Sequence, residues 1–303
     1  MKKVKKMIKF GDYLQQVNGK VREGIGAIEG GQYQYLFISS SGLTLKKRDV
    51  WVLKQNIKNG VIAEHRFSRD SMLIPHKSLV RGLRRISGLD KIDVTDNLDF
   101  IITKSFPEID RILQLFEGKK RDLSFIKKWE KHVMGTVGNV AFMRRFDISA
   151  PGSRLLAFYS SIYMAPLGVM WAIKVPDHDA KILSLWLNST INILQVLRER
   201  KETRGAFLQI DGYTLQNMWV LNCSSLSNEE KSLLLTTFNE LKDLSFPSIL
   251  DQLRNKFHGR VLLDKVILRV LGYDEYRSVK LIEYLYSSLR NEIERLKSLM
   301  EGK

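Results

Sequence analysis

Cysteine is nearly absent from this chain of 303 residues, since Cys223 is the only one. A single cysteine excludes a disulfide within the chain and a zinc site built on several cysteines, and it is typical of a reducing compartment such as the cytoplasm. Long apolar runs are also absent, so the sequence predicts no membrane span, and residues 1–10 lack the apolar core of a signal peptide. We therefore expect a cytoplasmic protein without a membrane partner.

Motifs of enzyme active sites and metal sites are missing as well. The five histidines are scattered without the spacing of a metal-binding pair, and Ser149 does not stand in a G-x-S-x-G turn. The glycine-rich residues 24–31 follow no apolar strand, and Glu29 occupies the place of the third glycine in a nucleotide-binding turn. We predict no catalytic, metal-binding or cofactor-binding residue in this chain.

Residues 175–181 contain the letters of a metal-nuclease signature, but Asp177 and Asp179 are too close in sequence for that chemistry. The two acids are better explained as N-cap and first-turn residues of a helix over 182–197, where carboxylates accept from free amide groups and favour the helix dipole. A metal-dependent nuclease, or another nucleic-acid hydrolase whose acids are dispersed, remains an alternative.

The charge of the chain is strongly positive. Lysine and arginine outnumber aspartate and glutamate by 49 to 33, which gives a formal net charge of +16 and a pI near 9.8. Such an excess predicts attraction to a polyanion, of which DNA is the obvious candidate. The length suggests two lobes around sizeable cores. A non-catalytic basic scaffold that binds DNA without regard to sequence is a second alternative.

The most informative stretch is residues 182–222. Its apolar residues first recur at helical spacing, a hydrophilic basic elbow follows at 198–205, and then come a short strand at 206–210, a turn, and an apolar run at 219–221. This spacing alone is typical of an ordinary α/β unit with a solvated turn. The literal run Leu187-Asn188-Ser189-Thr190 inside the helix makes the stretch more distinctive.

This order of elements resembles the target-recognition half of adenine-specific DNA methyltransferases of restriction–modification systems, of the TaqI-like type with a C-terminal specificity domain. Other segments are similar to the same family, and Val80-Arg81-Gly82 departs from it where proline and alanine are common. These segments are residues 20–26, 88–94, 99–102, the Ser149-Ala150-Pro151-Gly152 stretch that follows two arginines, 166–173 and 263–272.

The resemblance implies sequence-specific binding of double-stranded DNA without the catalytic domain. Methylation of adenine in that family depends on an Asn-Pro-Pro-Tyr type of loop, which grips the amine of a flipped base. The six prolines here, Pro75, Pro107, Pro151, Pro166, Pro176 and Pro247, are never adjacent, so this chain cannot form that loop. We expect a catalytic methyltransferase subunit as partner, carrying the loop and S-adenosylmethionine, and this chain as the specificity half.

Two segments supply the residues expected to contact DNA. The elbow at 198–205 lies between a buried helix and a buried strand, and its arginines suit guanine, although Glu199 and Glu202 could simply pair with them in solvent. Strand alternation puts Arg144 and Arg145 on opposite sides, so that one can face DNA while the other pairs internally, for example with Asp147. The predicted DNA-binding residues are Arg144, Arg145, Ser153, Arg154, Arg198, Arg200, Lys201, Thr203 and Arg204.

The predicted fold class is mixed α/β (α+β), a recognition lobe with mixed sheets and a helical C-terminal tail. We divide the chain into a β-rich part at 1–118, a central α/β recognition lobe at 119–245 and a helical tail at 246–303. A buried strand is expected at 98–103, and a basic amphipathic helix at 119–131 has Leu123, Ile126 and Trp129 on its apolar side. In the tail, Gly272 is expected to end one helix. An apolar stripe from Ile282 to Met300 is expected to pack on the body or on a partner helix.

Overall fold

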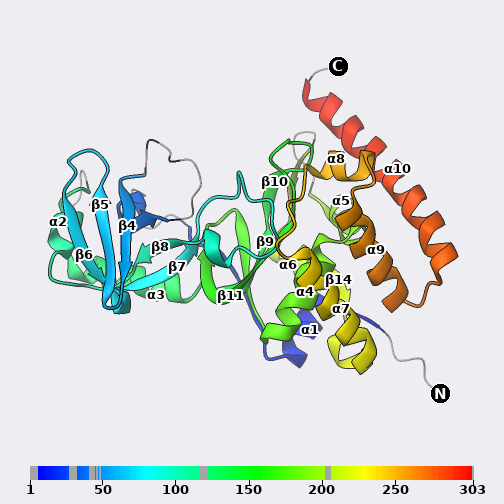
Figure 1. Ribbon diagram of the computed structural model, residues 1–303, viewed down its shortest axis with the longest axis horizontal. Coiled ribbons are helices and arrows are strands. Elements are labelled where there is room, and N and C mark those ends of the chain that lie inside the picture. The colour runs from blue at the N-terminus through cyan, green and yellow to red at the C-terminus, as the bar shows by residue number, and fades with distance from the viewer. Residues whose placement is uncertain are drawn as a thin grey trace.

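A mixed ten-stranded sheet extends through the left and central parts of the molecule in Figure 1, with C-terminal helices at the right, which confirms the predicted mixed α/β fold. The computed structural model describes residues 6–26, 33–40, 45, 47, 49–116, 122–201 and 206–301. The strand order in the sheet is β2-β12-β9-β11-β7-β8-β3-β4-β5-β6. These strands are β2 (Lys20–Glu23), β3 (Phe37–Ser39), β4 (Trp51–Ile57), β5 (Gly60–His65), β6 (Ser71–Pro75), β7 (Leu79–Leu83), β8 (Asp99–Ile102), β9 (Gly138–Met143), β11 (Ala157–Pro166) and β12 (Met170–Lys174).

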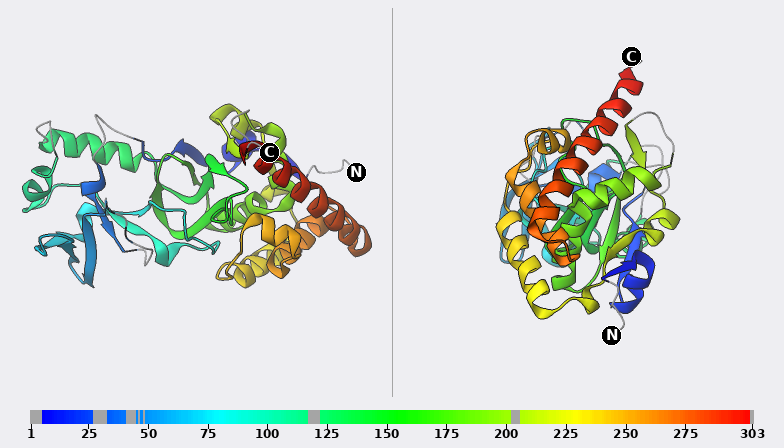
Figure 2. Two further views of the ribbon diagram at one scale, coloured as in Figure 1. Left: turned by 90° about the horizontal axis from the view of Figure 1, so that it is seen from above. Right: turned by 90° about the vertical axis from the view of Figure 1, so that its right-hand side faces the viewer.

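Buried apolar side chains form two separate clusters, one on each part of this sheet. The first packs strands β3 to β8 against α2 (Ile109–Leu113) and α3 (Leu123–Met134), and Figure 2 shows α3 on one face of those strands. The second cluster packs β9, β11 and β12 against the remaining helices. The division into three chain segments stays a prediction. In the structure α3 packs in the first cluster, and β2 pairs with β12.

The first cluster confirms the buried strand expected at 98–103. Every residue of β8 is buried, and the flanking Leu98 and Thr103 are buried too. The helix α3 begins after Asp122, whose side chain accepts from the amides of Ser124 and Phe125. Trp129 lies on the buried side of α3 and donates from its indole nitrogen to the Ile102 carbonyl at 2.8 Å. The placement of Leu123 on that apolar side was wrong, because its side chain is exposed at the first helical turn.

The helix expected over 182–197 is in fact two helices, α4 (Asp177–Asn188) and α5 (Thr190–Glu199). Ser189, which has an extended backbone, separates the two helices. Its hydroxyl accepts from the amide of Asn192 as the N-cap of α5. Asp177 and Asp179 lie in the first turn of α4 as expected, but Pro176 occupies the N-cap position. The apolar periodicity did not reveal two elements, because every residue of α4 from Ile182 to Asn188 is buried and apolar residues continue into α5.

Asn188 explains why this break is needed. Its side-chain oxygen accepts from the amides of Leu156 and Ala157 at 2.8 and 3.1 Å, and its nitrogen donates to the Ala157 carbonyl at 2.8 Å. These bonds satisfy the beginning of β11 deep in the second cluster. Its backbone carbonyl, freed at the end of α4, accepts from the buried Arg260 guanidinium. The distinctive Leu-Asn-Ser-Thr run is therefore a structural junction between the sheet and the C-terminal helices.

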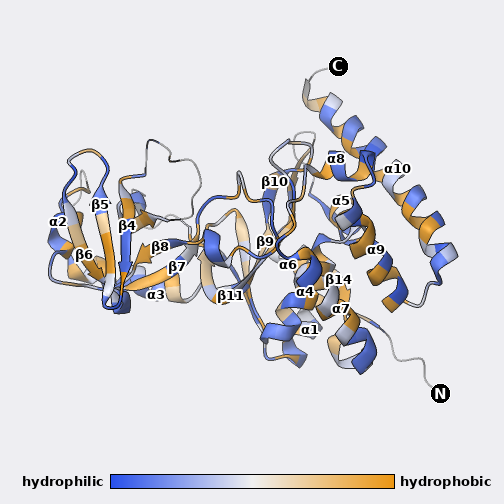
Figure 3. Cartoon of the chain, viewed as in Figure 1, coloured by the Kyte–Doolittle hydropathy of each residue, from blue (hydrophilic) through white to orange (hydrophobic). Residues whose placement is uncertain are grey.

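The C-terminal helices cover the second cluster and include α7 (Asn228–Leu241), α8 (Ile249–Arg254), α9 (His258–Val270) and α10 (Glu275–Glu301). Gly272 follows α9 with a φ of +97°, which confirms the predicted helix end. The apolar stripe of α10 packs on the body, since Ile282, Leu289 and Ile293 are buried; Figure 3 shows apolar and polar residues alternating along this helix. Within the described residues no helix is long and apolar enough to cross a membrane.

A buried carboxylate joins α10 to the helix junction. The Asp264 side chain accepts from the Thr190 amide and hydroxyl at 2.8 and 2.6 Å and from the Tyr286 hydroxyl at 2.7 Å. Complete burial raises the pKa of Asp264 above its ordinary value, opposed by the nearby Arg260 charge and these donors. Three helices, α5, α9 and α10, therefore share one buried polar contact.

Candidate nucleic-acid interface

Two hollows with basic linings adjoin each other at β2, because both are lined by Glu23 of that strand. The first, about 620 Å³, lies between β2 and α3. The side chains of Lys128 and Lys131 extend from the exposed side of α3, opposite the buried Trp129, and Arg22 extends from β2. Burial lowers the pKa of His132, so this ring adds no charge near neutral pH. The lining residues are Arg22, Glu23, Lys128, Lys131, His132, Gly135 and Thr136.

The second hollow, about 460 Å³, lies beside the first and shares Glu23 with it. It is bounded by β2, the end of β7 and the connections around β10 (Arg145–Asp147) and β12. Four arginines line it: two follow β7, one lies between β9 and β10, and one begins β10. The lining residues are Glu23, Ile25, Gly26, Arg84, Arg85, Ile86, Ser87, Arg144, Arg145, Leu167, Gly168 and Val169.

The two arginines after β7 are structural rather than available to a ligand. Arg84 pairs with Asp49 at 2.8 Å and with Asp99 at 3.0 Å, while Arg85 pairs with Asp49 at 3.0 Å. All four side chains are buried, and Ser39 accepts from both guanidinium groups. Two cations and two carboxylates neutralise one another here, so this cluster fixes the wall of the hollow without adding much external charge.

The remaining two arginines divide as the strand alternation predicted. Arg144 is largely enclosed, with 14% of its side chain exposed, whereas Arg145 is exposed. The internal partner differs from the one suggested, because the Arg144 guanidinium pairs with Glu23 at 2.6 Å and donates to the Gly168 carbonyl at 3.1 Å. The suggested partner, Asp147, instead accepts from the amide and hydroxyl of Ser149.

A short ribbon brings the elbow to the same place as Arg145. The strand β10 pairs antiparallel with β13 (Phe207–Gln209), which confirms the strand expected there, and Arg145 lies opposite Gln209. Lys201 forms a further bridge with Gln209. Arg145 and Lys201 therefore flank one residue at the end of the ribbon. The Lys201 ammonium lies 2.5 Å from Asp211 and is the main cause that lowers the pKa of this carboxyl to about 2.

The other described elbow residues differ sharply in exposure. Arg198 is 82% exposed and pairs only loosely with Glu199 at 3.4 Å, as the solvent-pairing alternative proposed. Arg200 is 24% exposed, donates to the Leu197 carbonyl at the end of α5, and lies 3.4 Å from Glu292 of α10. Arg200 thus caps a helix. Thr203 and Arg204, with Glu202, lie outside the described residues.

Ser153 and Arg154 line neither basic hollow. The Ser153 hydroxyl donates to the Asp147 carbonyl, closing the turn after β10, and its own carbonyl accepts from the Ile249 amide at 2.9 Å. Arg154 pairs with Asp90 at 3.5 Å, and its carbonyl accepts from the Gln252 side chain at 2.7 Å. Both residues therefore attach α8 to the sheet.

The predicted DNA-binding residues did not include four residues that line the first hollow, Arg22, Glu23, Lys128 and Lys131. The basic side of α3 was visible as a charge pattern, but such patterns are usually solvated surface. Only the pairing of β2 with β12, far away in sequence, places β2 in front of this helix. No local signal in residues 20–26 could have shown that neighbour.

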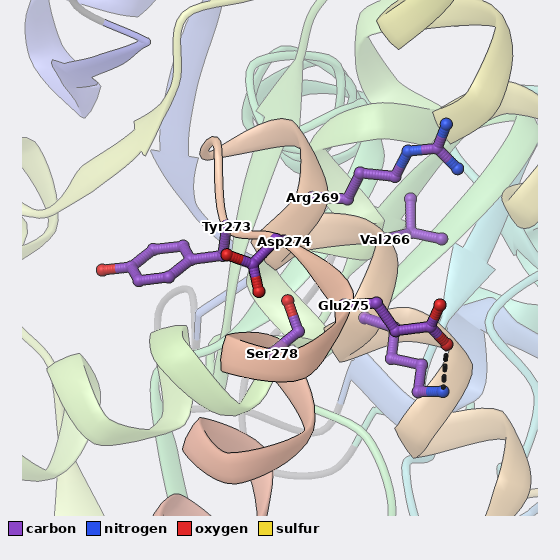
Figure 4. A pocket seen from close by; sticks show the side chains of 7 residues that line it. Val266, Arg269, Tyr273, Asp274, Glu275 and Ser278 are labelled. Atoms are coloured by element: carbon purple, nitrogen blue, oxygen red, sulfur yellow. Dashed lines mark ion pairs between the residues drawn. The ribbon is translucent and has the colours of Figure 1, made fainter.

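A third hollow, about 340 Å³, lies between the end of α9 and the beginning of α10 (Figure 4). It mixes charges, with Lys265 and Glu275 paired at 3.5 Å beside Arg269 and Asp274, so it does not extend the basic linings. Over the part of the chain that the structure describes, no three histidine, cysteine, aspartate or glutamate side chains gather as a metal ion would require. Asp177 instead pairs with Lys181 at 2.7 Å and accepts from the Tyr159 hydroxyl.

The arrangement of the chain is similar to part of a solved structure, that of the type IIG restriction endonuclease BpuSI. The two superpose with a TM-score of 0.63 over 97% of this chain, at 14% sequence identity. The chain spans 32% of the length of that enzyme, so the shared fold corresponds to about a third of it. No family model matches the sequence, and no curated protein sequence does.

Proposed function

We propose that this chain binds double-stranded DNA in a sequence-specific manner as the recognition part of a restriction–modification system in the cytoplasm. The observation that carries the proposal is the pair of adjoining hollows, whose exposed cations come from β2, α3 and the end of the β10–β13 ribbon. Duplex DNA presents two lines of phosphates, and proteins grip them mainly with lysine and arginine.

The supporting cations lie on rigid elements. Lys128 and Lys131 project from a helix fixed by the buried Trp129, and Arg145 begins a strand paired on β13. Side chains on such supports can meet phosphates in a fixed register, which a flexible tail cannot do. Lys201, whose ammonium is partly neutralised by Asp211, lies at the edge of the same region.

The fold supports the same assignment. About a third of a restriction endonuclease has this arrangement of strands and helices, and the whole enzyme is much longer. We propose that a catalytic methyltransferase subunit supplies the remaining chemistry, with its Asn-Pro-Pro-Tyr loop and S-adenosylmethionine. The described residues support this proposal, because the buried arginines pair with buried carboxylates inside the protein, whereas exposed cations line the two basic hollows.

The proposal is tested by the salt dependence of binding to mixed-sequence duplex DNA, followed by fluorescence anisotropy. We expect the logarithm of the association constant to fall with the logarithm of salt concentration at a slope steeper than about −3. The double variant Lys128→Ala/Lys131→Ala should flatten this slope by about 2, since each phosphate contact contributes about 0.9.

The control is Lys280→Ala, which removes one positive charge from α10, where the ammonium lies over the Tyr276 ring. This variant should leave the slope nearly unchanged. A flat titration of the unaltered protein would refute DNA binding by the hollows. If each lysine removed changed the salt slope by the same amount, whatever its position, the basic scaffold would be favoured, because only net charge would then matter.

A further inference from the structure

Glu23 stands out because it is the one acidic residue among the described side chains that line the two basic hollows. It lines both of them, and 48% of its side chain is exposed. A carboxylate placed between phosphate-binding cations repels the phosphates and so opposes non-specific binding. Its position therefore calls for a role that a neutral or basic residue could not fill.

The carboxylate of Glu23 is fixed in place from one side. Its Oε1 atom lies 2.6 Å from the Arg144 guanidinium, which is itself fixed by the Gly168 carbonyl and by the Trp171 ring at 5.4 Å. Glu23 also lies opposite Trp171 in the β2–β12 ladder, so both backbone and side chain are set by the sheet. Among described residues, Oε2 has no hydrogen-bond partner and remains available to a ligand.

We propose that Glu23 reads a base edge in the major groove by accepting a hydrogen bond from the exocyclic amino group of cytosine. This inference rests on the proposed DNA binding and names the residue that would give it specificity. Carboxylates suit that amino group, whereas phosphate oxygens, being acceptors themselves, offer them nothing. Arg144 is then a positioning residue that orients Glu23, and Arg145, Lys128 and Lys131 hold the backbone on either side.

Stabilisation of Arg144 alone does not account for the position of Glu23. Arg144 already has a carbonyl acceptor and an aromatic ring, and a buried acid would neutralise it better than one that is half exposed. This half-exposed side chain belongs to both hollows, and a base edge would lie between them if the flanking cations contacted phosphates.

The test is a selection of bound duplexes from a library with randomised base pairs, followed by sequencing, with the full chain and three variants. The unaltered protein should enrich cytosine at one position. Glu23→Gln should shift that position toward adenine, because a glutamine amide pairs with adenine in the major groove, and Glu23→Ala should lower the cytosine preference by roughly tenfold or more.

Lys128→Ala is the matched control, because loss of a phosphate contact should weaken all sequences alike and leave the preferences intact. If the unaltered protein enriches no sequence although it binds DNA with a steep salt slope, the sequence-specific part of the proposed function fails. If it has a preference that Glu23→Gln and Glu23→Ala both leave unchanged, the function stands and the role of Glu23 is overturned. Loss of binding together with a lowered melting temperature in both variants would also overturn it, as a purely structural role.

Discussion

Asn188 shows how one side chain can decide the local course of the backbone. Its amide replaces the missing strand partners at the beginning of β11, and the helix must end at this residue for its carbonyl to accept from Arg260. A helical-wheel argument counts Asn188 as a polar residue on an otherwise apolar face. Its three long-range hydrogen bonds are invisible without the strand and helix that receive them.

Substitution of Asn188 by alanine should therefore be costly. Two buried amides and one buried carbonyl would lose their partner, and we expect a free energy of unfolding lower by roughly 3 kcal/mol. Urea denaturation followed by circular dichroism measures this loss. The matched control Asn217→Ala removes an exposed amide that donates only to the Tyr213 carbonyl, and it should change stability by less than about 0.5 kcal/mol. Equal effects of the two variants would contradict the junction role of Asn188.

At the scale of elements, the sequence was informative wherever a signal was local. The N-terminal acids of α4, the glycine after α9 and the buried strand β8 were predicted because capping, positive φ and continuous apolar runs depend on neighbouring residues. The division of the 182–197 helix was missed, although Ser189 is a good N-cap residue. The carbonyl at the end of α4 accepts from Arg260 of α9, more than 70 residues later, and apolar periodicity cannot predict that contact.

The candidate interface follows the same rule. Alternation along 142–147 separated Arg144 from Arg145 correctly, because it needs only the period of a strand. It could not find Glu23 as the partner of Arg144, since that pair joins residues from β2 and the β9–β10 connection. Arg200 was predicted as a reading residue from its type, and the structure shows it capping α5 beside Glu292.

The packing of α10 gives a prediction at this scale. Ile293 is completely buried between α10 and the body, and it lies next to Glu292, which contacts Arg200. Ile293→Ala should lower the free energy of unfolding by about 2–5 kcal/mol, as deletions of buried aliphatic groups do. Thermal or urea denaturation checks this. Tyr284→Ala, on the exposed side of the same helix, should cost little; a similar loss in both variants would mean that the stripe does not stabilise the body.

At the scale of the whole molecule, composition predicts a polyanionic partner, and the proposed methyl transfer would need a loop that this sequence does not contain. No two prolines are adjacent, and the amides of Gly24 and Ile25 donate to the Met170 and Pro166 carbonyls on either side of the β11–β12 connection. We expect the purified chain to give no binding heat with S-adenosylmethionine in calorimetry and no methyl incorporation into DNA. Micromolar cofactor binding would contradict the proposed division between this chain and a catalytic partner.

The pairing of the first strands has a consequence for how the protein is made. Among the described residues, strand β2 pairs with β12, and β1 (Met7–Lys9) pairs with β14 (Trp219–Leu221), so both early strands stay unpaired during synthesis until these later strands have left the ribosome. Until then their edges are open to pairing with other chains. Contacts between such distant residues also slow folding. We expect the protein to complete its folding late and as one unit. Its yield of folded protein should therefore rise at low growth temperature or with chaperones that cover these early strands.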